Sequence, residues 1–246
     1  MDAVWPATYR AGMSDSEDVV ESALAGLWSV VNQLARLRPE RAGEYRVTIF
    51  GSARLAPESE AYGRVRELAR RLAAAGCGIV TGGGPGLMQA ANEGERLGDP
   101  GNLRRTVGVR VELPFEKGAN PFVEEAYVHQ SFFTRLHHFA RLSDAFIVME
   151  GGIGTTLESL MVWQLLQVRQ LQDVPLVFVG PMWRGLVRWA REQMLREPAL
   201  ASPKDLDLPT CVDSIEEAAA VIEAHRARRL LALSAGPCRG KAAKSS

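Results

Sequence analysis

The chain has 246 residues, of which 46% are hydrophobic and 24% are charged, as in an average globular protein. These values exclude a disordered chain, a collagen and a coiled coil, and the length suits one large domain. The 29 basic and 29 acidic residues give zero net charge, which disfavours a dedicated nucleic-acid-binding protein.

Residues 1–44 are predicted to form an arm followed by a helix. Ser14 and Glu17 have the spacing of a capping box, apolar residues then recur at helical spacing, and Pro39 closes the helix. The sequence has no signal-peptide pattern and no run of 18 apolar residues that could cross a membrane. Its 3 cysteines lack metal-binding spacing and indicate reduced thiols, so we expect a cytoplasmic protein without a bound metal.

Short apolar runs and amphipathic segments alternate over residues 45–233. Strands are predicted at 46–50, 77–81, 107–112, 123–130, 145–149, 176–179 and 210–212, and helices at 58–75, 86–97, 133–142, 155–170, 182–196 and from 214 to about 233. The alternation predicts an α/β fold, namely one doubly wound, mainly parallel, Rossmann-like sheet with helices on both faces and an extra N-terminal helix. Residues 234–246 are small and basic and are predicted to be a disordered tail.

Glycine-containing turns follow three of the predicted strands, each just before a helix: Gly51-Ser52, Gly82 to Gly86, and Gly151 to Thr155. In a doubly wound sheet the carboxyl ends of the strands form the edge at which ligands bind. Glycine lets a ligand approach the backbone amides, and the helix N-terminus that follows favours an anion. The three turns therefore predict a phosphate site, although each one alone could simply be a tight connection.

Two common phosphate ligands do not fit these turns. The first strand is not followed by G-x-G-x-x-G, which disfavours a dinucleotide. The run from Gly82 to Gly86 does not continue into G-K-[ST], which excludes the usual triphosphate loop. No lysine follows any of the turns, so a nucleoside monophosphate fits better.

The stretches GGGPGLMQAAN at 82–92 and GGIGTTLE at 151–158 carry a family resemblance. The sequence resembles the Lonely Guy family of phosphoribohydrolases, whose hallmark is PGGxGTxxE and which was long labelled lysine decarboxylase-like. The resemblance covers roughly residues 45–195. It implies release of a free base and ribose 5-phosphate from a nucleoside 5′-monophosphate, such as AMP or a cytokinin ribotide, with no cofactor.

The resemblance also implies the site residues. It places the family's catalytic pair on Arg135 and on Glu158, which we expect in the first turn after the glycine loop. It further implies a homodimer or larger homo-oligomer, with the helices around 157–171 and 19–35 as candidate interfaces. The expected substrate-binding residues are Gly51, Ser52, Gly83, Gly84, Met88, Gly151, Gly152, Gly154 and Thr155.

Two positions depart from the family pattern. Glu150 replaces the proline of the hallmark, and its carboxylate would repel a phosphate if it pointed inward. Leu136 stands where many members carry a lysine after the arginine. Two further pairs of residues have two possible roles each. His137 and His138 are either proton donors or structural residues, and Met88 and Phe133 either line a pocket for the base or belong to the core.

Breaking an N-glycosidic bond builds positive charge on the ribose, which a carboxylate such as Glu158 can stabilise while it deprotonates water. Arg135 can hold the phosphate or ribose hydroxyls. The alternatives are a salt bridge of purely structural value, and a non-catalytic nucleotide-binding or carrier protein on the same scaffold. A pyridoxal-dependent lysine decarboxylase is disfavoured, because no lysine lies in a glycine-rich turn or beside the pair. The lysines are Lys117, Lys204, Lys241 and Lys244.

Overall fold

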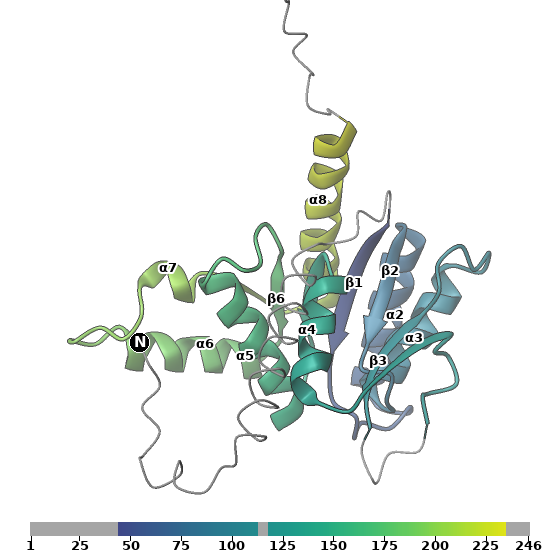
Figure 1. The fold of residues 1–246 in the computed structure, drawn as a ribbon, viewed down its shortest axis with the longest axis horizontal. Helices are drawn as coiled ribbons and strands as arrows, with labels where there is room; N and C mark the ends of the chain where they lie inside the picture. The colour runs from purple at the N-terminus through teal and green to yellow at the C-terminus, as the bar shows by residue number, and fades with distance from the viewer. Residues whose placement is uncertain (1–43, 113–117, 235–246) are drawn as a thin grey trace, which may run out of the picture. The chain divides into compact units, whose positions relative to one another are not determined.

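The computed structural model describes residues 44–112 and 118–234 (Figure 1). They all belong to one of the two units into which the chain divides, Gly43–Ser246. Apart from residues 44 and 234, the arm and helix expected over 1–44 and the tail expected over 234–246 lie outside the described residues. They stay predictions, as does the single-domain boundary at 45–233.

A single parallel sheet organises the described part of the chain, with the strand order β4-β3-β2-β1-β5-β6-β7. The strands β1, β2, β5 and β6 are buried along their whole length, which explains why they read as continuous apolar runs. Strand β4 lies at an edge and alternates with exposed positions, so its sequence pattern is weaker. The strands are β1 (Tyr45–Phe50), β2 (Cys77–Thr81), β3 (Val107–Val111), β4 (Glu125–His129), β5 (Ala145–Val148), β6 (Leu176–Val179) and β7 (Pro209–Val212).

The helices begin and end within a few residues of their predicted bounds. They are α2 (Glu60–Ala74), α3 (Leu87–Gly98), α4 (Phe132–Leu142), α5 (Ile153–Gln167), α6 (Pro181–Met194), α7 (Pro203–Leu206) and α8 (Ile215–Ser234). The short helix α7 was not predicted. It is held by a capping box in which Ser202 and Asp205 satisfy each other's backbone amides.

Helices cover both faces of the sheet, as predicted. On one face α2, α3 and α8 pack over a buried cluster that includes Val47, Ile49 and Ile79. On the other face α4, α5 and α6 pack over a second cluster that includes Phe146 and Phe178. Each such fully buried side chain stabilises the fold by about 1.5–3 kcal/mol. No helix in the described ranges is long and apolar enough to cross a membrane.

The strand order reverses between β1 and β5. The chain runs outward from β1 to β4 and then returns, so that β5 pairs with the other side of β1. The loops that follow these two strands meet through the Ser52 amide, which donates to the carbonyl of Glu150 at 2.9 Å. A ligand crevice is expected outside the carboxyl ends of the strands at this point.

The glycine turn after β2 joins the same edge. The Leu87 amide, at the start of α3, donates to the carbonyl of Ser52 at 2.9 Å. Gly86 has a positive φ of 68°, and a Cβ there would lie 2.4 Å from the Ser52 oxygen, so this close approach requires glycine. The structure thus brings all three predicted turns to one edge of the sheet.

Candidate active site

A cavity of about 500 Å³ opens at the carboxyl edge of the sheet, within the size range of small-molecule sites. The loop after β1, the turn after β2 and the N-terminal parts of α4 and α5 form its walls. The lining residues are Gly51, Ser52, Ala53, Arg54, Gly82, Met88, Val111, Phe132, Arg135, Gly152, Ile153, Gly154, Thr155 and Glu158.

Arg135 is fixed on several sides. It lies in the first turn of α4, a helix that begins where the hydroxyl of Ser131 accepts from the amide of Phe133 at 3.2 Å. Its Nε donates to the carbonyl of Val109 at 2.8 Å, and its guanidinium carbon lies 5.2 Å from the centre of the Phe139 ring. Its Nη1 lies 2.9 Å from Oε1 of Glu158. Because these contacts hold the guanidinium, it needs little reorganisation to meet a ligand.

Glu158 completes this pair. The sequence predicted Glu158 in the first turn of its helix. Because α5 begins at Ile153, Glu158 lies in the second turn instead. Its side chain is only 11% exposed. Burial raises the pKa of Glu158 to about 7, while the neighbouring Arg135 acts in the opposite direction. A carboxyl group that ionises near neutral pH is suited to general acid–base chemistry.

The N-terminus of α5 supplies the environment for an anion. Gly152 is the N-cap residue and provides no side-chain cap. The first amides of the helix therefore have no acceptor within it, and the helix dipole favours negative charge there. Gly152, Gly154 and Thr155 line the cavity beside them. This combination is typical of a phosphate site.

Six of the nine expected substrate-binding residues line the cavity: Gly51, Ser52, Met88, Gly152, Gly154 and Thr155. The structure gives the other three supporting positions. The carbonyls of Gly83 and Gly84 accept from the backbone and side-chain amides of Asn120, both at 2.9 Å. Gly151 packs against the side chain of Thr155.

Sequence reasoning missed two informative lining residues. A Cβ on Gly82 would lie 2.4 Å from Nη2 of Arg135 and 2.6 Å from Sδ of Met88, so this glycine makes room for the guanidinium. Its position directly after β2 could have identified it. Arg54 also lines the cavity, and its side chain forms no ion pair within the described residues. In the sequence it resembles any solvated arginine.

The two departures from the family pattern lie outside the cavity. The carboxylate of Glu150 forms an ion pair with Arg64 of α2, so it does not face the cavity as an uncompensated charge. Leu136 is 9% exposed and is not among the lining residues. Both positions are therefore compatible with an anion in the cavity.

The residues with open interpretations differ in their position relative to the cavity. His137 is exposed and His138 contacts His129, with 2.9 Å between their ring nitrogens, and neither histidine of α4 lines the cavity. Met88 lines it, whereas Phe133 is 79% exposed and does not. Across residues 44–112 and 118–234, no group of three or more His, Cys, Asp or Glu side chains is placed to hold a metal ion.

The fold is that of a Rossmann-like α/β protein with a crevice at the carboxyl edge of its sheet, and solved structures share this fold. The molybdenum cofactor carrier protein from Chlamydomonas reinhardtii aligns with a TM-score of 0.56 and 18% identity, covering 75% of this chain and 99% of that one. The molybdenum cofactor binding protein from Rippkaea orientalis aligns with a TM-score of 0.54 and 17% identity, covering 74% of this chain and 96% of that one. TM1055 aligns with a TM-score of 0.52 and 22% identity, covering 73% of this chain and 98% of that one. At these identities the likeness shows the fold alone.

The family is established by sequence. The model described as "Possible lysine decarboxylase" matches residues 88–222, more than half of the chain, so the chain belongs to this family. The resemblance to the Lonely Guy family is thereby confirmed. The pyrimidine/purine nucleotide 5′-monophosphate nucleosidase of Escherichia coli (strain K12) is 30% identical over 109 residues, which is 42% of this chain. The chain spans about a quarter of the length of that relative, 24%.

Proposed function

We propose that the protein hydrolyses the N-glycosidic bond of a nucleoside 5′-monophosphate and releases the free base and ribose 5-phosphate. The observation that carries this proposal is the buried Arg135–Glu158 pair, 2.9 Å apart, in a cavity that also contains the N-terminus of α5. The partial likeness to a nucleotide 5′-monophosphate nucleosidase supports the same reaction class.

The 5′-phosphate binds at the N-terminus of α5. The free amides of the first turn and the hydroxyl groups of Ser52 and Thr155 supply neutral donors at the cavity wall. Arg54, which has no ion-pair partner among the described residues, adds a cation at the same wall. Binding by backbone donors explains how a chain of zero net charge can hold a dianion.

Glu158 acts on the ribose. As the bond between C1′ and the base nitrogen breaks, its electron pair goes to the base, and positive charge builds on the ribose. The carboxylate of Glu158 stabilises this charge and takes a proton from the water that attacks C1′. The departing base takes up a proton, so the sum of the steps is the addition of one water molecule. Arg135 positions Glu158 and binds the ribose hydroxyls or the phosphate.

The expected pH dependence follows from the raised pKa of Glu158, about 7. Only the ionised carboxylate can accept the proton, and the ionised fraction grows as the pH rises through this value. Turnover is therefore expected to increase between about pH 6 and 8.

The substrate is AMP or a cytokinin ribotide, and the protein acts in the cytoplasm as a homodimer or larger assembly. Exposed apolar side chains of α5 support self-association, since Leu157 is 48% and Leu160 is 44% exposed. Leu160 also lines an apolar groove of about 440 Å³ together with Trp189 and Leu200. Sedimentation equilibrium tests the assembly: the wild type is expected to be oligomeric and Leu160→Glu to dissociate, whereas a monomeric wild type contradicts it.

A carrier function is the second candidate, because the similar solved structures include molybdenum cofactor carrier proteins. A carrier would leave a bound nucleotide intact. A pyridoxal-dependent decarboxylase is disfavoured further by Lys204, the one lysine in the described ranges, because it lines a different cavity, beside Leu208 and His225.

The proposal is tested by incubating the protein with AMP, GMP, IMP, CMP and UMP and separating the products by chromatography. The expected products are free base and ribose 5-phosphate in equal amounts from at least one nucleotide. Release of orthophosphate and a nucleoside would indicate a phosphatase instead. Binding without any release of base would establish the carrier function.

A further inference from the structure

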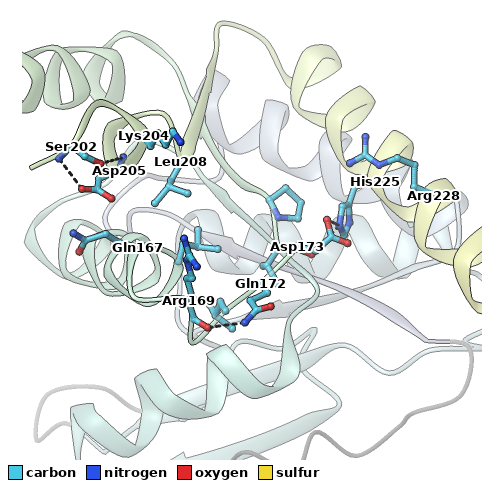
Figure 2. Close-up of a pocket in the computed structure, with 14 residues that line it drawn as sticks. Gln167, Arg169, Gln172, Asp173, Ser202, Lys204, Asp205, Leu208, His225 and Arg228 are labelled. Carbon is cyan, nitrogen blue, oxygen red and sulfur yellow. Dashed lines mark hydrogen bonds and ion pairs between the residues drawn. The ribbon is translucent and has the colours of Figure 1, made fainter.

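A second cavity, of about 720 Å³, lies at the opposite edge of the sheet (Figure 2). It is bounded by the C-terminal end of α5, the segments that lead into β6 and β7, the helix α7 and one side of α8. The lining residues are Leu166, Gln167, Arg169, Leu171, Gln172, Asp173, Val174, Pro175, Ser202, Lys204, Asp205, Leu208, His225 and Arg228. The candidate active site is lined by residues from the N-terminal end of α5, and this second cavity by residues from its C-terminal end. The two cavities therefore share a helix but no lining residue.

Three basic side chains line this cavity. Arg169, Lys204 and Arg228 form no ion pair with any residue in the described ranges. Figure 2 shows them on separate elements, Arg169 after α5, Lys204 on α7 and Arg228 on α8. Like charges around one hollow repel each other, and an anionic ligand would relieve this repulsion.

The two carboxylates that line the cavity have other roles. Asp205 accepts the amide of Ser202 at 2.8 Å as part of the capping box of α7. The carboxylate of Asp173 is 83% exposed and lies 3.4 Å from Nε2 of His225, whose hydrogen bond is with the Asp173 backbone carbonyl at 3.0 Å. Three cations therefore face two carboxylates in the lining, which has a formal net charge of +1.

The backbone at Arg169 provides an independent observation. Helix α5 ends in a Schellman motif, in which the amides of Gln170 and Arg169 donate to the carbonyls of Leu165 and Leu166. Arg169 occupies the left-handed position of this motif with a φ of 60°, where glycine is the usual residue. A long cation therefore lines the cavity at a position where the helix cap favours glycine.

The same feature occurs a second time at this cavity. Among the described residues, Asn102, Arg169 and Asp173 are the non-glycine residues with positive φ, and two of these three line the cavity. The floor between them is apolar, with Leu166, Leu171 and Leu208 among the lining residues. A ligand that matches this surface carries negative groups on an apolar body.

We propose that this cavity binds a small organic anion with at least two negative charges, from phosphate or carboxylate groups, on an apolar body. The proposal does not depend on nucleotide hydrolysis at the other edge. It rests on the cations of Arg169, Lys204 and Arg228, the strained backbone of Arg169 and the apolar floor.

Isothermal titration calorimetry of the full chain with 1-naphthyl phosphate and 2,6-naphthalenedicarboxylate tests the proposal and separates the two sources of charge. Saturable binding of at least one probe is expected, with at least tenfold weaker binding by Arg228→Glu. The matched control is Arg96→Glu, which makes the same charge change at an exposed position on α3 and should bind as the wild type does. No saturable binding, or equal weakening in both variants, would overturn the proposal.

Arg169→Gly guards against misfolding as the cause of lost binding. It removes a cation and places the usual residue at the left-handed position, so the melting temperature should stay the same or rise. Affinity for the bound probe should nevertheless fall at least fivefold. Unchanged affinity in this variant would overturn the proposal, because the probe would then be bound elsewhere.

Discussion

The two edges of the sheet differ in the groups that they offer to an anionic ligand. At the carboxyl edge, glycine turns and a helix N-terminus offer neutral backbone donors, and the Arg135–Glu158 pair is buried, so that Arg54 is the one exposed cation among the described lining residues. At the amino edge, exposed side chains such as Arg169 and Arg228 carry the charge. Because salt screens exposed charges much more than buried ones, anion binding at the amino edge should weaken more steeply with ionic strength.

The largest effect is expected for Glu158→Gln, which keeps the shape of the side chain but cannot accept a proton. Turnover should fall about 10³-fold, within the range that general-base catalysis contributes. Nucleotide binding, measured by calorimetry, should remain, because the amides and hydroxyls of the phosphate site are unchanged. Activity within tenfold of the wild type would show that Glu158 is not the base.

A tenfold to hundredfold loss of kcat/KM is expected for Gly82→Ala. The added methyl group would lie 2.4 Å from Nη2 of Arg135, so the guanidinium must move away from its place beside Glu158. Gly63→Ala in α2 is the control, because a Cβ at this position would meet nothing within 4 Å beyond its chain neighbours and the backbone of its own helix. That variant should keep full activity and gain about 0.5–1 kcal/mol of stability. Equal activity in the two variants would contradict this account of Gly82.

Glu95 provides a buried carboxyl group outside both cavities. One oxygen accepts the amide of Ile79 at 2.8 Å, the other has no partner among the described residues, and burial raises the pKa to about 8. Since the pKa is lower in the unfolded chain, the folded state binds more protons between the two values, and stability falls as the pH rises toward 8.

Glu95→Gln removes this dependence. Between pH 5 and 9 the wild type should lose about 1–3 kcal/mol more stability than the variant, as measured by urea unfolding. The contribution of Glu158 is common to both proteins and cancels. Parallel loss of stability in the two proteins would show that Glu95 ionises normally.

The smallest effect is expected for Arg64→Gln, which removes the cation beside Glu150. The freed carboxylate should repel the phosphate at the neighbouring loop, raising KM about twofold to fivefold with little change in kcat. Arg64→Lys keeps the charge and should restore the wild-type KM. If KM is unchanged in Arg64→Gln, the ion pair has no part in binding.

The local patterns that predicted the fold were strong where burial is complete. The apolar runs of β1, β2 and β6 were located to within a residue, because strands buried on both faces read as continuous runs. The helix α7 escaped prediction because Pro203–Leu206 is too short to show helical periodicity. The glycine turns and the family motif placed Arg135 and Glu158 on the two helices that the structure brings together.

The remaining site residues depend on tertiary geometry. Gly82, and not Gly83 or Gly84, lies against Arg135, while Asn120, which lies far along the chain, binds the carbonyls of the other two glycines. The second cavity joins Arg169, Lys204 and Arg228 from separate elements, and no sequence motif links them. Such dispersed side chains become a site only when the fold brings them together.

The most direct test of the central account is the pH dependence of base release by the wild type with the nucleoside monophosphate that it cleaves fastest. With Glu158 as the base, the rate should rise through a pKa of about 7 and then level off. Arg135→Met should move this rise to higher pH, because it removes the cation that lowers the pKa of Glu158. A rate that is already at its plateau at pH 5, in both proteins, would contradict the assignment of Glu158 and Arg135.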